Sequence, residues 1–162
     1  MGSSKKFKIL AFDPGLTNLG YILLEGNTDN GDVVVVHMGE MHPGPVTDRA
    51  AYREDVSKFD KRTISLAYMR EQIQILVDKF KPDFICAEDI YCNPRRIQAY
   101  GALCMIICVM RMFCRDYANK YLVTIPTKIC KRETCGSGGG GKIGVQESLI
   151  NHKHIKFANE FD

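Results

Sequence analysis

Two carboxylates stand at the ends of two apolar, strand-like segments, and their placement indicates a metal site. Asp13 ends the segment Lys6–Asp13, and Glu88 ends the segment Phe84–Glu88. If the segments are parallel neighbours in a sheet, their backbones lie roughly 5 Å apart and both carboxylates meet at one edge. Carboxylates that close repel each other unless one is protonated or a cation lies between them. Because Mg²⁺ prefers such oxygen ligands, the pair predicts a metal-dependent active site.

A glycine-rich tract at 136–143 (GSGGGGKI) is the second feature that could do chemistry. It nearly matches the G-x-x-x-x-G-K-[ST] loop of nucleotide-binding proteins, but Ile143 stands where that loop needs a hydroxyl for Mg²⁺. We therefore expect no nucleotide cofactor. Three interpretations stay open: an ordinary flexible loop, an engineered linker, or a loop that follows a phosphate backbone through Ser137 and Gly138 and brings Lys142 to it.

Two groups of basic residues flank the predicted carboxylate edge. One is Arg95 and Arg96, and the other is formed by Lys128, Lys131 and Arg132. A charge cluster is usually a solvated face, and the net charge of +3 permits a nucleic-acid partner without requiring one. Both groups, however, lie just beyond strand ends, where ligands bind in α/β sheets. We expect them to contact phosphates.

The elements that must position these residues follow from the hydrophobic pattern. The first three strands form an antiparallel meander, because a strong turn at 27–31 separates the second from the third. The fold class is α/β, with a mixed five-stranded sheet flanked by helices, and its long crossover leaves room for strand four beside strand one. The expected strands are 6–13, 20–25, 32–37, 84–88 and 121–125, and the expected helices are 66–80, 95–117 and 143–151.

The expected helix at 95–117 is apolar almost all round, so most of its surface must be covered. It is either the central core helix or a helix that packs in part against a second subunit, and both interpretations stay open. Its apolar stretch, 99–110, is too short to cross a bilayer, so we expect no membrane partner.

Length and cysteine usage bound the remaining possibilities. The chain has 162 residues, which predicts one domain over 5–162, with residues 1–4 as an expression scar. Its seven cysteines lack the spacing of a zinc site, so we expect buried free thiols and a reducing compartment.

Three motifs taken in order resemble the RuvC-like Holliday junction resolvases, which belong to the RNase H-like nucleases. They are Asp13-Pro14-Gly15 with Gly20-Tyr21, Ala87-Glu88 after an apolar strand, and the segment Thr134 to Val145. The resemblance spans nearly the whole chain and implies an RNase H-like fold. It further implies two Mg²⁺ or Mn²⁺ ions held by the first Asp, by the Glu that ends the fourth strand, and by a D-x-x-D pair near the chain end.

Carried over by motif, Asp13 and Glu88 are metal ligands and Asp162 is the first residue of the terminal pair. The second Asp and its helix are absent from the 162 residues, so we expect a truncated form or a site completed differently, with Glu160 as a weaker substitute. Lys142 matches the lysine of the family's glycine-bearing loop, where its charge would offset the charge that develops on the phosphate.

The implied activity is Mg²⁺-dependent hydrolysis of phosphodiester bonds in branched DNA, above all the four-way junction. A junction has two equivalent strands to cut, which suits a symmetric homodimer. The expected location is the cytoplasm of a bacterium or a virus-infected cell. Two alternatives remain: an RNase H-like nuclease acting on flaps or RNA–DNA hybrids, and a junction-binding module without catalysis.

Overall fold

A computed structural model describes residues 5–15, 17–42, 53–91, 97–135, 142–152 and 154–158. The strands are β1 (Lys6–Asp13), β2 (Leu19–Asn27), β3 (Val33–Met41), β4 (Phe84–Glu88), β5 (Leu122–Ile125) and β6 (Ile155–Phe157). The helices are α1 (Arg53–Lys58), α2 (Lys61–Phe80), α3 (Ile97–Asp116), α4 (Thr127–Cys135) and α5 (Lys142–Ile150).

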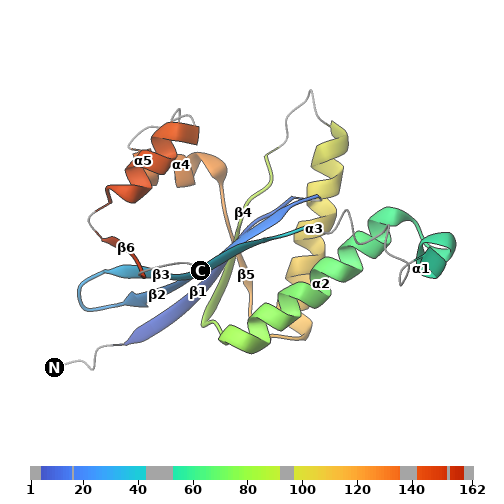
Figure 1. Cartoon of the computed structure of the whole chain (residues 1–162), viewed down its shortest axis with the longest axis horizontal. Helices are drawn as coiled ribbons and strands as arrows, with labels where there is room; N and C mark the ends of the chain where they lie inside the picture. Colours follow the sequence, from blue (N-terminus) through green and yellow to red (C-terminus); the bar gives the residue numbers. More distant parts are fainter. Residues whose placement is uncertain are drawn as a thin grey trace.

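All six strands form one mixed sheet in the order β5-β4-β1-β2-β3-β6 (Figure 1). The strands β1, β2 and β3 form the expected antiparallel meander, and β4 is parallel to β1 as the crossover argument predicts. The predicted five-stranded sheet is one strand short, because β6 adds to the free edge of β3 in parallel orientation. The helix α4 was not predicted either.

The helices α2 and α3 cover one face of the sheet, here called the closed face. The core between these layers is apolar and almost fully buried; its members include Leu10, Phe12, Leu23 and Ile85 on strands and Met69, Ile73, Ile106 and Met110 on helices. Asp60 begins α2 as its N-cap and accepts hydrogen bonds from the backbone N–H groups of Arg62 and Thr63. None of the described helices is both long and apolar enough to span a membrane.

The other face, here called the open face, lies beneath α4 and α5, which stand on the opposite side of the sheet from α2 and α3 (Figure 1). A largely apolar cavity of about 690 Å³ lies between this pair of helices and β1, β2 and β3. Its lining includes Ala11, Ile22 and Met38 from the sheet and Val145 and Leu149 from α5.

The helix α3 is not covered all round in the isolated chain. Its inner face contributes Ile106, Met110 and Phe113 to the core. Its outer face leaves Ile97 68% and Met112 64% exposed, and Met105 is also exposed. Among the described cysteines, all of which are free thiols, Cys108 is exposed, so the prediction that the cysteines are buried is wrong for this one.

Candidate active site at the edge of the sheet

The backbone register brings Asp13 and Glu88 to the same level on neighbouring strands. Parallel pairing of β1 with β4 runs from Ile9 opposite Phe84 to Phe12 opposite Ala87, and the next residue on each strand is a carboxylate. Residues level with each other on parallel strands point to the same face, so both carboxylates lie on the open face, roughly 5 Å apart at the backbone. Asp13 is exposed and Glu88 is half-buried.

This register is fixed at the opposite end of β4 by a reciprocal pair of hydrogen bonds. The backbone N–H of Lys8 donates to the carboxylate of Asp83 at 2.7 Å, and the N–H of Asp83 donates to the carbonyl of Lys8 at 2.9 Å. Pro82, buried just before this pair, ends the connection from α2. At the carboxylate edge, the N–H of Asp89 donates to the carbonyl of Ile125 at 2.8 Å and so ties the end of β4 to β5.

A third carboxylate, Glu40, lies in the same row of the sheet and was not predicted. Asp13 is opposite Gly20 on β2, and Gly20 is opposite Glu40 on β3. Gly20 has no side chain to separate the two carboxylates. Glu40 pairs with His42, whose Nε2 lies 3.5 Å from its Oε2, and the Nδ1 of His42 lies 3.1 Å from the Oδ1 of Asn18.

The carboxylates do not form a complete metal cluster by themselves. Among the described residues, no three His, Cys, Asp or Glu side chains converge closely enough to hold an ion. The donor set nevertheless fits a hard divalent cation, because the two level groups at the strand ends are both carboxylates. Further ligands to such a cation would come from water, substrate or residues outside the described ranges.

A small hollow of about 150 Å³ adjoins Glu88. Its lining comes from the ends of β1 and β4, from α3 and from the first residue of α4: Pro14, Glu88, Asp89, Ile90, Tyr91, Leu103 and Thr127. Cys130 of α4 lies close to Glu88 as well. Burial raises the pKa of the Cys130 thiol, and the negative charge of Glu88 raises it further. Burial also raises the pKa of the Cys86 thiol, with a smaller contribution from the charge of Cys130.

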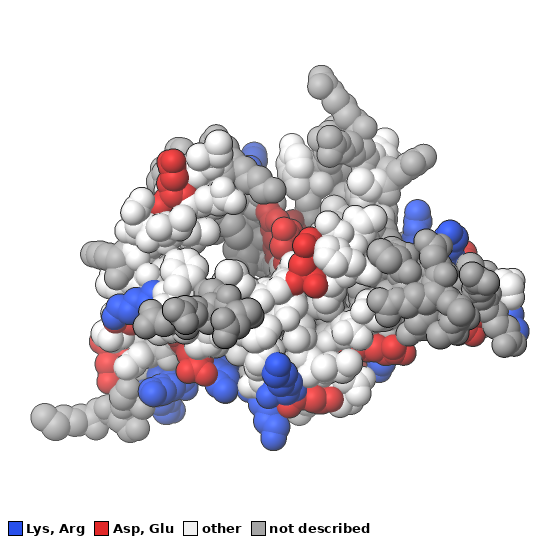
Figure 2. Space-filling model, in the orientation of Figure 1, with Lys and Arg blue, Asp and Glu red and all other residues white. Residues whose placement is uncertain are grey.

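The surface around the site is acidic. Figure 2 shows acidic side chains gathered in the hollow between the α4–α5 pair and the α3 side of the molecule, while most lysines and arginines visible in this view lie at the lower and right-hand margins. Such a hollow repels a phosphodiester unless cations neutralise it.

The predicted basic residues of 128–132 all lie on α4. Lys128 is exposed, Lys131 is half-buried, and Arg132 donates from Nε and one terminal nitrogen to the carboxylate of Glu133 at 3.0 and 2.9 Å. Lys142 begins α5, but its side chain is outside the described part. The predicted residues Arg95, Arg96, Ser137, Gly138, Glu160 and Asp162 also lie outside the described ranges.

The strand order and directions, with helices on both faces, define an RNase H-like fold. No protein-family model matches the sequence, and no curated protein is similar to it. Solved structures do match. RuvC of Thermus thermophilus bound to a Holliday junction substrate aligns with a TM-score of 0.64 and 14% identity, over 88% of this chain and 77% of RuvC.

Two further resolvases share the fold. Ydc2, a yeast mitochondrial Holliday junction resolvase, aligns with a TM-score of 0.60 and 17% identity, over 93% of this chain and 64% of Ydc2. The fowlpox virus resolvase, solved with Holliday junction DNA, aligns with a TM-score of 0.55 and 11% identity, over 91% of this chain and 79% of the viral protein. At these identities the likeness establishes the fold, and the RuvC-like architecture expected from the sequence is confirmed.

Proposed function

We propose that this protein is a Mg²⁺- or Mn²⁺-dependent endonuclease that cuts four-way DNA junctions. The observation that carries the proposal is the level placement of Asp13 and Glu88 at the ends of parallel β1 and β4, within a fold shared with three junction resolvases. Two of those resolvases were solved with junction DNA, which supports the same substrate class here.

In this proposal the roles of the carboxylates follow from their places in the row. Asp13 lies on β1, one of the two middle strands of the sheet, and would hold the metal together with Glu88 on the neighbouring β4. When bound, the metal pair supplies activation of a water and stabilisation of the leaving oxygen. Lys142, at the start of α5, would offset the negative charge that develops on the phosphate.

The length of chain after β6 is sufficient for Asp162 to act as a third ligand. One row of register pairs contains Phe157, Val35, Leu24 and Ile9. Phe157 lies three strand spacings from Ile9 across the sheet, and Asp13 lies four residues beyond Ile9 along β1. The Cα atoms of Phe157 and Asp13 are therefore roughly 20 Å apart. Five extended residues span roughly 17 Å, and two Asp side chains cover the difference. We therefore retain Asp162 as the proposed third ligand.

The acidic hollow supports a requirement for metal in binding as well as in cleavage. A phosphodiester that entered this hollow would lie close to the carboxylates. The basic residues on α4 offset the negative charge of these carboxylates only in part, because Arg132 is paired with Glu133. Neutralisation by divalent cations removes that repulsion. Junction affinity should therefore fall when a chelator replaces Ca²⁺, a cation that can occupy such oxygen-rich sites.

A cleavage panel tests the proposal. Purified protein is incubated with Mg²⁺ or Mn²⁺ and a labelled four-way junction, a flap, an RNA–DNA hybrid or plain duplex of the same sequence. We expect preferential cutting of the junction. Preferential cutting of the hybrid or flap would replace the proposed substrate, and absence of any cutting by a folded protein would contradict the proposed activity.

A second candidate is a junction-binding module without catalysis. The observation that favours it is that the described carboxylates do not form a complete metal cluster. Tight junction binding in Ca²⁺, together with no cleavage in Mg²⁺ or Mn²⁺, is the result that would establish this alternative.

We further propose that the protein acts as a homodimer through the outer face of α3. Apolar or small residues recur there at helical spacing, as a stripe of Ile97, Gly101, Met105, Cys108 and Met112. Single exposed apolar residues are common, but a continuous stripe from Ile97 to Met112 on a 20-residue helix is typical of an interface. Isologous pairing of two copies would place two carboxylate edges in one complex, as two equivalent junction strands require.

A further inference from the structure

The helices α4 and α5 form an arm that is attached to the rest of the fold at its two ends. They pack against each other, while the cavity of about 690 Å³ separates them from much of the open face. At one end Pro126 joins the arm to β5, and at the other residues 151–154 join it to β6. The position of the arm therefore depends mainly on how these two ends are held.

The β5 end is held beside the carboxylate edge. Backbone N–H groups of Ile129 and Cys130 donate to the carbonyl of Pro126 at 2.8 and 3.1 Å, which begins α4 directly after the strand. Thr127 lines the same hollow as Glu88. This end is thus fixed by covalent continuity with β5, an edge strand whose four residues all pair with β4 beside the carboxylates.

The β6 end depends on a strand of only three residues. Parallel pairing joins Ile155–Phe157 to Val33–Val35, with flanking hydrogen bonds from the N–H of Val33 to the carbonyl of His154 at 2.8 Å and from the N–H of Ala158 to the carbonyl of Val35 at 3.0 Å. Ile155 is half-buried, and Lys156 and Phe157 are exposed. So short a strand buries little apolar surface and needs additional contacts to stay paired.

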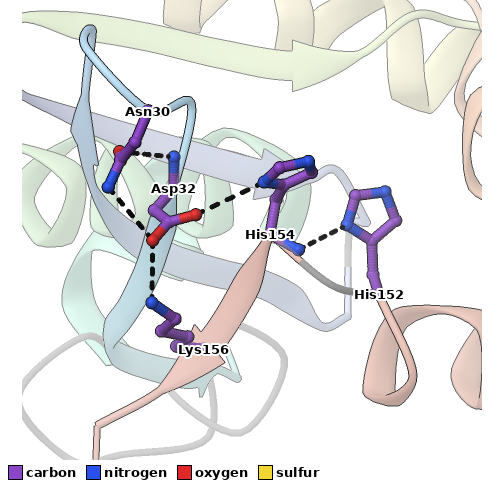
Figure 3. Close-up of polar contacts among 5 residues, drawn as sticks. All are labelled: Asn30, Asp32, His152, His154 and Lys156. Carbon is purple, nitrogen blue, oxygen red and sulfur yellow. Dashed lines mark hydrogen bonds and ion pairs between the residues drawn. The ribbon is translucent and has the colours of Figure 1, made fainter.

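Asp32, directly before β3, supplies those contacts. Its carboxylate accepts from the Nζ of Lys156 at 2.7 Å and from the amide of Asn30 at 3.2 Å, and the Nδ1 of His154 lies 3.3 Å from it (Figure 3). The Asp32 N–H donates to the side-chain oxygen of Asn30 at 3.0 Å, which orients the carboxylate toward β6. Its side chain is 24% exposed, and hydrogen bonds from Lys156 and then His154 lower its pKa.

We propose that Asp32 is a positioning residue that holds β6 on β3 and thereby fixes the far end of the α4–α5 arm relative to the carboxylate edge. Asp32 lies at the opposite end of the sheet from Asp13 and touches no proposed reacting group. Its effect on DNA would pass through the arm, which carries Lys128 and Lys131. That second part rests on the proposed function, whereas the attachment of β6 does not.

The attachment is tested by hydrogen exchange on the full chain with Asp32→Asn. Loss of a charge-assisted contact should raise exchange at the amides of Val33 and Ala158 by about tenfold, with β1 and β2 amides unchanged. Asp29→Asn is the matched control, because it removes the same charge from the same turn and no described residue bonds the Asp29 carboxylate. Wild-type exchange at Val33 and Ala158 in Asp32→Asn would overturn the proposal.

The positioning role is tested by steady-state cleavage of the four-way junction. Asp32→Asn should lower kcat/KM for the junction several-fold, because β6 positions both the arm that carries the lysines and the chain that leads to Asp162; Asp32→Glu should restore part of it. Faster exchange with an unchanged kcat/KM would overturn the positioning role. If Asp32→Asn does not fold, Lys156→Met removes the same ion pair from the other strand and takes its place in both measurements.

The two parts of the proposal fail in distinguishable ways. A wild-type protein that cuts no DNA contradicts the proposed function, and the exchange measurement still decides whether Asp32 holds β6. An active wild type with no difference between Asp32→Asn and Asp29→Asn contradicts the positioning role alone.

Discussion

The two faces of the central sheet differ in their side chains: one face is packed in the core, and the other carries the carboxylates. On the closed face Leu10, Phe12 and Ile85 pack against α2 and α3 and are almost fully buried. On the open face the same strands present Ala11, Asp13 and Glu88 to a cavity, a small hollow and the acidic surface. Alternation along a strand thus lets β1 and β4 stabilise the fold with one set of side chains and present the site with the other.

The largest expected effect comes from changing the two open-face carboxylates, which should abolish activity without unfolding the protein. Asp13→Asn or Glu88→Gln should lower the cleavage rate by about a thousandfold or more, because a neutral amide no longer holds the metal. Thermal stability should change little, since neither group belongs to the core. Junction binding in Ca²⁺ should also change little, because each amide removes a repelling charge together with the metal ligand.

Glu25→Gln is the control for that experiment, because Glu25 is a sheet carboxylate paired with Lys8 far from the carboxylate edge. Its activity should match wild type. Undiminished cleavage by Asp13→Asn would remove Asp13 from the site.

The converse prediction concerns the closed face. Met69→Ala should lower the free energy of unfolding by about 2–5 kcal/mol, because Met69 is 1% exposed and its loss leaves a cavity. Ile22→Ala, at a half-buried position on the open face, should lower the free energy of unfolding by only about 1 kcal/mol, since the Ile22 side chain lines a cavity that already exists. Urea denaturation measures both, and equal losses would contradict the difference between the faces.

The third prediction addresses the outer face of α3, which neither layer covers. Met112→Glu should weaken self-association at least tenfold, because burying an unpaired carboxylate in an interface is unfavourable. Sedimentation velocity measures it. Ile75→Glu, the same apolar-to-acidic change at an exposed position on α2, is the matched control. A wild-type protein that is monomeric at micromolar concentration would contradict the dimer.

The smallest expected effect tests whether Glu88 acts on its surroundings electrostatically. Burial and, to a smaller extent, the negative charge of Glu88 raise the pKa of Cys130, so Glu88→Gln should lower that pKa and speed alkylation of Cys130 at pH 8 by about two- to threefold. Cys114 is the internal reference, because burial on the closed face raises its pKa to about 11 and should keep it slow in both proteins. Mass spectrometry of modified peptides follows each cysteine, and an unchanged rate at Cys130 would contradict the interaction.

The meander and the two strand-end carboxylates could be predicted because each depends on a local pattern. The placement of β4 beside β1 could be predicted because the long crossover leaves room for it there. Apolar runs ended by a charge define β1 and β4, and the 27–31 turn connects β2 with β3. The chemistry at the open-face edge therefore follows from the same residues that define the strands.

Glu40 was missed because the sequence pattern predicts that the third strand ends at residue 37, whereas β3 extends to Met41. Gly39 reads as a strand breaker, yet in the structure it is part of β3, where the ring of Tyr21 occupies the space that a side chain would need. A contact between neighbouring strands thus explains the glycine, and such contacts are not visible in one segment of sequence.

The strand β6 and the helix α4 were missed for a related reason. Three residues with one lysine among them have little strand signal, and β6 exists through pairing with residues more than 100 positions earlier. The segment of α4 is polar and only nine residues long, so it has little helical stability of its own. Both elements depend on tertiary contacts more than on their own sequence.

The reciprocal hydrogen bonds between Lys8 and Asp83 link correct folding to a correct site. If β4 paired one residue out of register, Glu88 would turn into the core and Ala87 would face outward, which would leave a buried, unpaired charge. Such a molecule would be unstable, so it would not accumulate as a folded but inactive form. The folded fraction of a preparation should therefore equal the fraction in which Asp13 and Glu88 are level, and measured specific activity should track folded protein alone.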